Sequence, residues 1–336
     1  MQWSHNISSW VFSGGGVKGV AYCGALMALE HLFQRAECDI FKQLRRTSGA
    51  SVGALFAAAL GLGMTGERLF RILDTECMLS GIINSLDLQQ LRTSWGLDSG
   101  EKLRESIKRV VQIGLQDLGA SDTDAEHLTL QQLKALTGVA VNISVTRLGD
   151  FSGQQRPRTE RFGPDTHPDV LLVDAIYISM AMPILFCPIR FRDGIYTDGA
   201  VMNNLPVEDC SAPETIVLTL RTRCLSADSG FGGYVETLLN TANESHDKAR
   251  IASFPFVLYL DSYGIQATAF HASRCEIIRG VLAGMIQTFI YASRFNTKIP
   301  TNNETQIEKI ESTILYKRFQ QSDPQEAALG QWPPVS

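Results

Sequence analysis

The chain has 336 residues, of which 44% are hydrophobic and 19% charged, and its formal net charge is −5. This length allows one large α/β domain or two smaller ones, with a sizeable core. The acidic balance and the lack of a basic stripe exclude nucleic acid as an expected partner, and they argue against purely charge-driven binding to anionic membranes.

The cysteines and the first residues favour an intracellular protein. The seven cysteines have no C-x-x-C spacing, so buried free thiols are expected rather than a disulfide framework or a zinc site. The residues before the first strand leave no room for a secretory signal, which predicts a cytoplasmic location. The apolar run 277–290 contains Arg279 and Gln287 and is too short to predict a membrane span.

The N-terminal segment predicts a strand, a glycine turn and a helix. Ser9–Ser13 is a short buried strand, Gly14–Gly19 has the sequence GGGVKG, and Val20–Arg35 is a helix rich in alanine and leucine. Three consecutive glycines at a helix N-terminus leave backbone N–H groups uncovered, which suits an anion or an oxyanion. Lys18 is followed by glycine instead of serine or threonine, so the pattern is not that of a P-loop.

A dinucleotide site is an alternative for the same turn. Gly14, Gly16 and Gly19 satisfy G-x-G-x-x-G, and Asp39 lies 20 residues after Gly19, where a ribose-binding carboxylate is expected. This segment alone favours a dinucleotide-binding oxidoreductase.

The next segment has the pattern of a nucleophile elbow. A strand predicted at Gln43–Ser48 leads into Gly49-Ala50-Ser51-Val52-Gly53, which is G-x-S-x-G, and a helix follows at Val52–Leu62. A serine on such a tight turn stands clear of the backbone, and its small neighbours avoid a clash. The helix N-terminus beneath Ser51 would favour developing negative charge. Taken alone, the motif also fits a small-residue turn into a buried helix.

The remaining elements are predicted from hydrophobic spacing and turn residues. Helices are expected at Glu67–Thr75, Glu101–Leu115, Leu128–Leu136, from Asp169 onward, at Tyr234–Ile251 and at Cys275–Arg294, and strands at Val139–Thr146 and Thr215–Leu220. Gln116–Glu126 and Gly149–Arg158 read as polar loops, and Arg192-Asp193-Gly194 as a hairpin turn.

Three separated motifs together resemble the patatin-like phospholipase family. They are the glycine run at 14–19, the G-x-S-x-G motif at 49–53 and Asp198-Gly199-Ala200, in the family's order G-G-G-x-[KR]-G, G-x-S-x-G and D-G-[GA]. Ser179–Pro188 and Asn203–Pro206 are also similar. The resemblance runs from about Ser9 to Leu220 and implies a three-layer α/β/α fold with a central, mostly parallel sheet. It reassigns the glycine run from a dinucleotide to an acyl-transfer site.

The resemblance implies that Ser51 and Asp198 form a catalytic Ser-Asp dyad. A carboxylate can take the serine proton if burial raises its proton affinity. We expect the backbone N–H groups of Gly14, Gly15 and Gly16 to form the oxyanion hole.

The residues themselves leave a histidine base open. In α/β-hydrolases the histidine follows the acid, which nominates His246 or His271. Neither lies in a recognisable turn motif and both fall outside the resemblance, so we expect surface or helix-packing positions for them. Lys18 could hold the glycine loop or attract a phosphorylated head group, although a solvated side chain is the simpler expectation.

The expected function is hydrolysis of fatty-acyl esters of phospholipids or related lipids, through an acyl-enzyme and without a metal or other cofactor. The apolar residues that suit an acyl chain, or equally a core, are Met180, Met182, Ile184, Leu185 and Phe186. The expected partners are the lipid ester and a membrane surface that the protein contacts peripherally. Acyl transfer or neutral-lipid hydrolysis at the same site, a non-catalytic lipid-binding module and the oxidoreductase remain alternatives.

One acyl hydrolase domain is expected over residues 8–295. Residues 296–336 are predicted to be a polar C-terminal tail with one weak helix around Ile307–Phe319.

Overall fold

The computed structural model describes residues 6–75, 82–83, 86–221 and 230–294. The chain divides into a compact unit, Met1–Tyr291, and a second unit, Ala292–Ser336, of which only the first three residues are described. The helix predicted around Ile307–Phe319 lies outside the described residues, so the tail stays a prediction.

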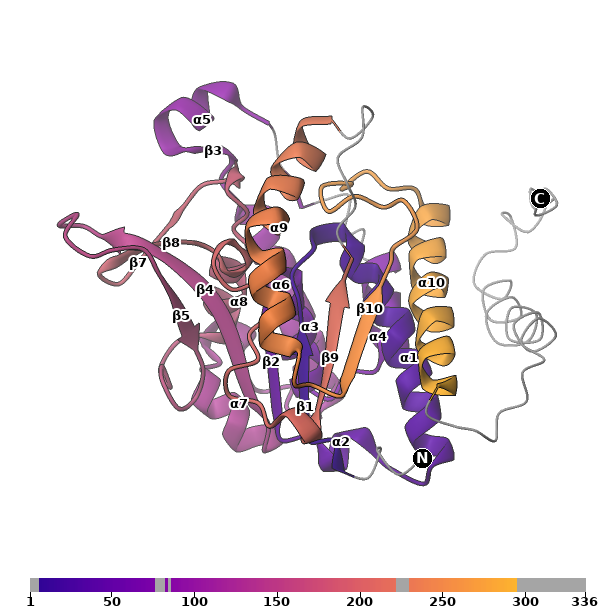
Figure 1. The fold of residues 1–336 in the computed structure, drawn as a ribbon. Helices are drawn as coiled ribbons and strands as arrows, with labels where there is room; N and C mark the ends of the chain where they lie inside the picture. The colour runs from indigo at the N-terminus through magenta and orange to yellow at the C-terminus, as the bar shows by residue number, and fades with distance from the viewer. Residues whose placement is uncertain (1–5, 76–81, 84–85, 222–229, 295–336) are drawn as a thin grey trace. The chain divides into compact units, whose positions relative to one another are not determined.

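An eight-stranded sheet forms the centre of the first unit (Figure 1). Its strands are β1 (Ser9–Phe12), β2 (Arg46–Ala50), β4 (Ala140–Asp150), β5 (Arg158–Phe162), β7 (Ile189–Phe191), β8 (Gly194–Asp198), β9 (Thr215–Leu220) and β10 (Phe256–Leu260). The order is β10-β9-β1-β2-β4-β8-β7, and β5 also pairs with β4. The strands from β10 to β4 are parallel, whereas β5, β7 and β8 are antiparallel to their neighbours. A separate pair is formed by β3 (Gly96–Asp98) and β6 (Ile184–Phe186).

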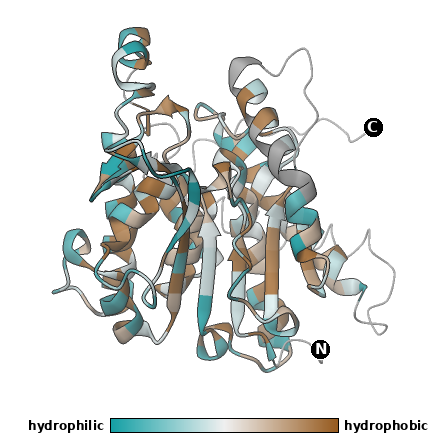
Figure 2. Ribbon diagram, turned by 60° about the vertical axis from the view of Figure 1, so that its left-hand side comes forward, coloured by the Kyte–Doolittle hydropathy of each residue, from teal (hydrophilic) through white to brown (hydrophobic). Residues whose placement is uncertain are grey.

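Helices cover both faces of the sheet, which confirms the α/β/α layering. They are α1 (Val20–Arg35), α2 (Ile40–Gln43), α3 (Val52–Gly61), α4 (Gly66–Thr75), α5 (Leu88–Ser94), α6 (Glu101–Asp117), α7 (Leu130–Thr137), α8 (Leu172–Ser179), α9 (Gly230–Ile251) and α10 (Arg274–Ser293). In Figure 1, α9 crosses in front of the sheet, and α3, α6 and α8 lie behind it. Figure 2 shows brown, apolar stretches along the strands and teal ones on the outer helices, as burial of the sheet on both faces requires.

Some predicted boundaries were wrong. The second strand begins at Arg46 instead of Gln43, because residues 40–43 form the short helix α2. The loop expected at Gly149–Arg158 is shorter, because β4 continues to Asp150 and β5 starts at Arg158. The hairpin turn predicted at 192–194 does join β7 to β8.

The register of β4 aligns two distant segments. Ala50, the last residue of β2, lies opposite Ser144, and Asp198, the last residue of β8, lies opposite Val145. Because Ser144 and Val145 are consecutive, the residue that follows Ala50 is brought next to Asp198. The G-x-S-x-G and D-G-A motifs are therefore brought together by β4, the strand that pairs with both β2 and β8.

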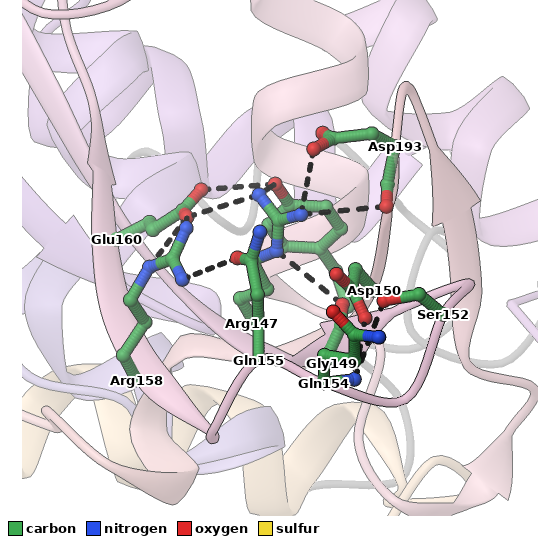
Figure 3. A network of polar contacts seen from close by, with 10 residues as sticks. Arg147, Gly149, Asp150, Ser152, Gln154, Gln155, Arg158, Glu160 and Asp193 are labelled. Carbon is green, nitrogen blue, oxygen red and sulfur yellow. Dashed lines mark hydrogen bonds and ion pairs between the residues drawn. The ribbon is translucent and has the colours of Figure 1, made fainter.

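A buried arginine fastens the strand that carries Asp198 (Figure 3). The Arg147 side chain on β4 is 6% exposed, and its guanidinium binds Asp193 at 2.9 Å and Glu160 at 3.4 Å. It also lies over the ring of Tyr196, 5.7 Å from the centroid. Tyr196 donates a hydrogen bond to Glu160, so one cation joins β4, β5 and β8 two residues before Asp198.

The helix α10 packs closely on α1. A Cβ added at Gly24 would lie 1.8 Å from the carbonyl oxygen of Val281, and one at Gly284 would lie 1.9 Å from that of Ala21. Among the described residues, α10 is the one helix whose length and mean hydropathy of 1.2 would suffice to cross a bilayer, and 44% of that stretch is buried. Its glycine-mediated contact with α1 is the packing of a core helix, so length and composition are weak evidence for a span.

Candidate active site

Ser51 occupies the sharp turn between β2 and α3. Its φ of 53° and ψ of −131° form a conformation that residues with a side chain rarely adopt. A Cβ at Gly49 would lie 2.1 Å from the carbonyl oxygen of Gly53, and one at Gly53 would lie 2.4 Å from that of Phe12. Neither position accepts a side chain, so close packing requires both glycines. The strand-turn-helix context expected for the elbow is confirmed.

The hydroxyl of Ser51 donates a 2.6 Å hydrogen bond to Oδ2 of Asp198. The other carboxylate oxygen of Asp198 accepts the N–H of Ala200 at 2.8 Å, and both catalytic candidates are buried. Burial raises the pKa of Asp198 to about 7, against the opposing effect of the two hydrogen bonds. A carboxyl group with such a pKa can take up and release a proton near neutral pH, as a general base must.

Ser179 orients the backbone of the elbow. Its hydroxyl accepts the N–H of Ser51 at 2.9 Å and donates to the carbonyl oxygen of Ser144 at 2.7 Å. This bond ties the elbow to β4 and satisfies an N–H group that the turn would otherwise leave buried without a partner. Sequence reasoning did not assign a role to Ser179, although it opens the stretch Ser179–Pro188 that matched the family pattern.

The glycine loop is clamped from two sides. The N–H of Gly14 is donated to the side-chain oxygen of Asn204 at 2.9 Å and to its backbone oxygen at 3.3 Å. On the other side, Val17 donates its N–H to the carbonyl oxygen of Ala267, and a Cβ at Gly16 would lie 2.2 Å from the same oxygen. Within the described residues, the N–H groups of Gly15 and Gly16 have no acceptor. The Gly14 amide is thus already occupied, whereas the next two remain able to bind an oxyanion.

Asn204 also connects the loop to α9. Its side-chain nitrogen lies 3.5 Å from Oδ2 of Asp247, whose pKa burial raises to about 6. The adjacent Asn203 accepts a hydrogen bond from Arg250, one helical turn further along α9. The two asparagines thereby join the segment after Asp198 to both the glycine loop and a covering helix. The sequence placed Asn203 and Asn204 in a stretch similar to the family pattern, but it did not indicate these contacts.

An apolar pocket of about 50 Å³ opens beside Ser51. Its walls come from the glycine loop, α1, α3, α4, α6, the segment before β6 and the loop before α10, and its lining residues are Gly16, Val17, Gly19, Val20, Ser51, Val52, Leu55, Phe56, Leu73, Ile82, Leu103, Ile107, Met180, Met182, Phe186 and Phe270. Of the five residues expected to suit an acyl chain, Met180, Met182 and Phe186 line the pocket, and Ile184 and Leu185 do not. An unbranched hydrocarbon chain fits the chemistry of these walls.

Two side chains singled out from the sequence have structural roles. Asp39 caps α2 by accepting the N–H groups of Phe41 and Lys42, which counts against a ribose-binding role. Lys18 is 4% exposed and donates to the carbonyl oxygen of Arg221, so the expectation of a solvated lysine was wrong.

Neither histidine candidate belongs to the site. His246 and His271 are exposed, and in the described part of the chain no histidine bonds to Ser51 or Asp198. The described residues also contain no group of three or more His, Cys, Asp or Glu side chains placed to hold a metal ion.

Comparisons with known proteins find relatives of similar sequence. The chain is 27% identical over 199 residues to a probable lipid hydrolase of Invertebrate iridescent virus 6, a match covering 59% of this chain and 61% of that protein. It is 28% identical over 256 residues to human patatin-like phospholipase domain-containing protein 5, covering 75% of this chain and 48% of the human protein. The chain thus spans less than two thirds of either relative.

A solved structure shares the fold. VipD from Legionella pneumophila superposes with a TM-score of 0.52 at 19% identity, over 86% of this chain and 67% of VipD. A family model described as patatin-like phospholipase matches residues 10–211, which include the glycine loop, the elbow and the Asp198 motif. The chain therefore belongs to the patatin-like phospholipase family.

Proposed function

We propose that the protein is a serine acyl hydrolase that cleaves fatty-acyl esters of phospholipids or related lipids through a Ser51-Asp198 dyad. The observation that carries this proposal is the 2.6 Å hydrogen bond from the Ser51 hydroxyl to a buried carboxyl whose pKa is raised to about 7. Family membership and the relative named as a probable lipid hydrolase support lipid ester hydrolysis as the reaction.

In the proposed first step, Ser51 Oγ attacks the ester carbonyl carbon while Asp198 accepts the hydroxyl proton. The tetrahedral oxyanion is held by the free N–H groups of Gly15 and Gly16 and by the positive end of α3. Gly14 is left outside the oxyanion hole, because its amide is donated to Asn204. The ester oxygen leaves as an alcohol with the proton from Asp198, which yields an acyl-enzyme.

In the second step, water attacks the acyl-Ser51 ester and gives its proton to Asp198. The fatty acid departs when Ser51 regains a proton from that carboxyl group. The same base therefore works in both half-reactions, and the described residues supply every group that the sequence of steps needs.

The pocket beside Ser51 supports a hydrocarbon acyl group as the part of the substrate that enters the protein. Because such esters reside in membranes, we infer that the protein works at a lipid surface as a peripheral protein.

Hydrolysis of a soluble short-chain ester, followed in wild type, Ser51→Ala and Asp198→Asn, tests the proposal. Wild-type turnover that both variants lose while circular dichroism shows them folded would support it. Equal turnover in wild type and Ser51→Ala would refute it.

A further inference from the structure

Apolar side chains are exposed on a projection formed by α5 and the residues flanking it. Leu86 is 62% exposed, Leu88 78% and Trp95 62%, although large apolar residues of a folded unit are usually covered. The projection stands out from the body of the unit, at the end toward which β9 points, in both Figure 1 and Figure 2. A convex projection that carries exposed apolar side chains cannot enclose a small ligand, so it fits a partner with a deformable surface.

A second exposed aromatic lies at the same end of the unit. Tyr263, in the loop between β10 and α10, is 67% exposed, and its N–H is held by the side chain of Asp261 at 2.8 Å. Figure 1 places this loop at the same end as α5. Trp and Tyr are the side chains typical of the boundary between lipid and water, because one part of each ring system is apolar and the other polar.

Both aromatic residues are held in a left-handed backbone conformation. Trp95 has φ 64° and Tyr263 has φ 46°. Bulky L residues adopt this region at a cost, and glycine is the usual choice where a helix ends this way. Fold stability alone therefore favours a smaller residue at both positions. The two rings therefore occupy positions where the backbone would prefer glycine.

Each exposed segment is joined to a wall of the pocket beside Ser51. Directly after Trp95, β3 pairs with β6, and two pocket-lining residues are Phe186, at the end of β6, and Met182, just before it. Past Tyr263, Ala267 accepts the N–H of Val17 in the glycine loop, and Phe270 lines the same pocket. A partner surface that contacts both Trp95 and Tyr263 would therefore lie next to the segments that form the pocket's walls.

The charge of the projection indicates which surface it fits. Between Leu86 and Trp95 the charged residues are Asp87 and Arg92, so the segment has no net charge, and the whole chain carries −5. A strongly anionic bilayer would repel the chain as a whole and find no basic cluster here. A zwitterionic bilayer accepts a projection without net charge whose exposed apolar side chains stand among polar ones.

We propose that Leu86, Leu88, Trp95 and Tyr263 form a membrane anchor that seats the pocket mouth on a zwitterionic phospholipid bilayer. This inference rests on the proposed lipid hydrolase function and adds the surface through which the protein reaches its substrate. The anchor inserts by burying apolar and aromatic side chains at the interface, and the strain at Trp95 and Tyr263 is retained because the rings act there.

The test is flotation of the full-length chain with phosphatidylcholine vesicles in a Ser51→Ala background, so that lipid is not consumed. Leu88→Gln and Trp95→Gly are each expected to lower the vesicle partition coefficient by about tenfold, since each removes most of an apolar side chain that the proposed anchor buries in the bilayer. Leu136→Gln is the matched control: Leu136 is 47% exposed on α7, at the opposite end of the unit in Figure 1, and its loss should leave partitioning unchanged.

Two further readouts separate anchoring from a structural role. Trp95→Gly and Tyr263→Gly should keep or raise the thermal midpoint, because glycine relieves the left-handed backbone, while vesicle binding falls. Fluorescence of the parent should shift to the blue on vesicle addition, and Trp95→Gly should lose that shift.

Undiminished partitioning of Leu88→Gln and Trp95→Gly would overturn the inference, as would binding that requires anionic lipid. A parent dimer that Leu88→Gln dissociates, without any change in vesicle binding, would instead assign this surface to a second copy of the chain. Hydrolysis of a soluble ester, measured with Ser51 intact in wild type and in Leu88→Gln, distinguishes the two proposals. An inactive wild type refutes the hydrolase. Normal hydrolysis together with normal vesicle binding by Leu88→Gln refutes the anchor alone.

Discussion

Oδ2 of Asp198 accepts a 2.6 Å hydrogen bond from the hydroxyl of Ser51, across 147 residues of sequence. The contact depends on β4, whose consecutive residues Ser144 and Val145 pair with the ends of β2 and β8. It is buried, it includes no histidine, and its serine lines an apolar pocket. The expected behaviour of the protein follows from these three properties.

Activity should depend on pH through Asp198. Because burial raises the pKa of this carboxyl to about 7, kcat/KM is expected to fall as the pH drops below neutrality and to level off above it. The measurement is a pH–rate profile for a soluble ester without ionisable groups, with circular dichroism at each pH to confirm folding. A rate that stays constant down to pH 5 would contradict this role of Asp198.

Stability should depend on the same group in the opposite direction to an ordinary salt-bridged acid. The pKa of Asp198 is higher in the folded state than its usual value of 3.8, so the folded protein holds the proton more tightly. The free energy of unfolding should therefore decrease as pH rises from about 4 to 7, by a few kcal/mol from this group. Urea unfolding of Asp198→Asn, compared with wild type, should lack this contribution, and identical pH dependence in the two proteins would disprove it.

Asn204 should affect turnover more than substrate binding. Asn204→Ala removes the side-chain oxygen that receives the Gly14 N–H and leaves only the longer backbone bond, so the glycine loop loses part of its hold. We expect kcat to fall by about tenfold, with a smaller change in KM. Asn203→Ala is the control, since that buried amide contacts Arg250 and Glu208 but not the loop. Equal kcat losses in the two variants would show a general structural effect.

Leu103 should limit the length of the acyl chain. It is buried on α6 and lines the pocket, so Leu103→Phe would shorten the available space. Hydrolysis of a butanoyl ester should drop by at least about tenfold relative to an acetyl ester. Leu115→Phe, on the same helix but away from the pocket, should destabilise the fold by about 1–3 kcal/mol without changing the chain-length ratio. A ratio unchanged by Leu103→Phe would mean that the acyl chain binds elsewhere.

Arg147 and its partner Asp193 should contribute unequally to the stability of the fold. Arg147→Met removes the guanidinium that contacts Tyr196, Asp193 and Glu160, while Glu160 keeps its 2.6 Å ion pair with Arg158, and we expect a loss of about 1–3 kcal/mol in the free energy of unfolding. Asp193 is 73% exposed, so Asp193→Asn should cost less than about 1 kcal/mol. Urea titrations measure both changes. Comparable losses would indicate that the guanidinium bonds mainly to Asp193.

Much of the fold could be predicted because its elements have strong local patterns. The elbow glycines and the apolar strands at β1 and β9 are legible in the sequence, and the run Phe256–Leu260 carries a strand signal as strong as theirs that could have located β10. By contrast, α5 has only seven residues and buries none of them, so no hydrophobic periodicity identifies it.

The site was less predictable, because its chemistry depends on contacts between distant segments. The pKa of Asp198 follows from burial, and the partner of the Gly14 amide lies 190 residues away. Lys18 is buried and donates to the carbonyl oxygen of Arg221, 203 residues away, which no local pattern indicates. Motifs thus nominated the groups that we propose react, whereas the proposal that Gly15 and Gly16, and not Gly14, bind the oxyanion needed coordinates.

Covalent trapping tests the central claim most directly. A fluorophosphonate reacts with an activated serine, loses fluoride and leaves a stable phosphonyl ester, which mass spectrometry of the digested protein locates. We expect one adduct per chain, on Ser51, lost in Asp198→Asn. Wild-type protein that hydrolyses esters yet carries the adduct on another residue, or none on Ser51, would contradict the account.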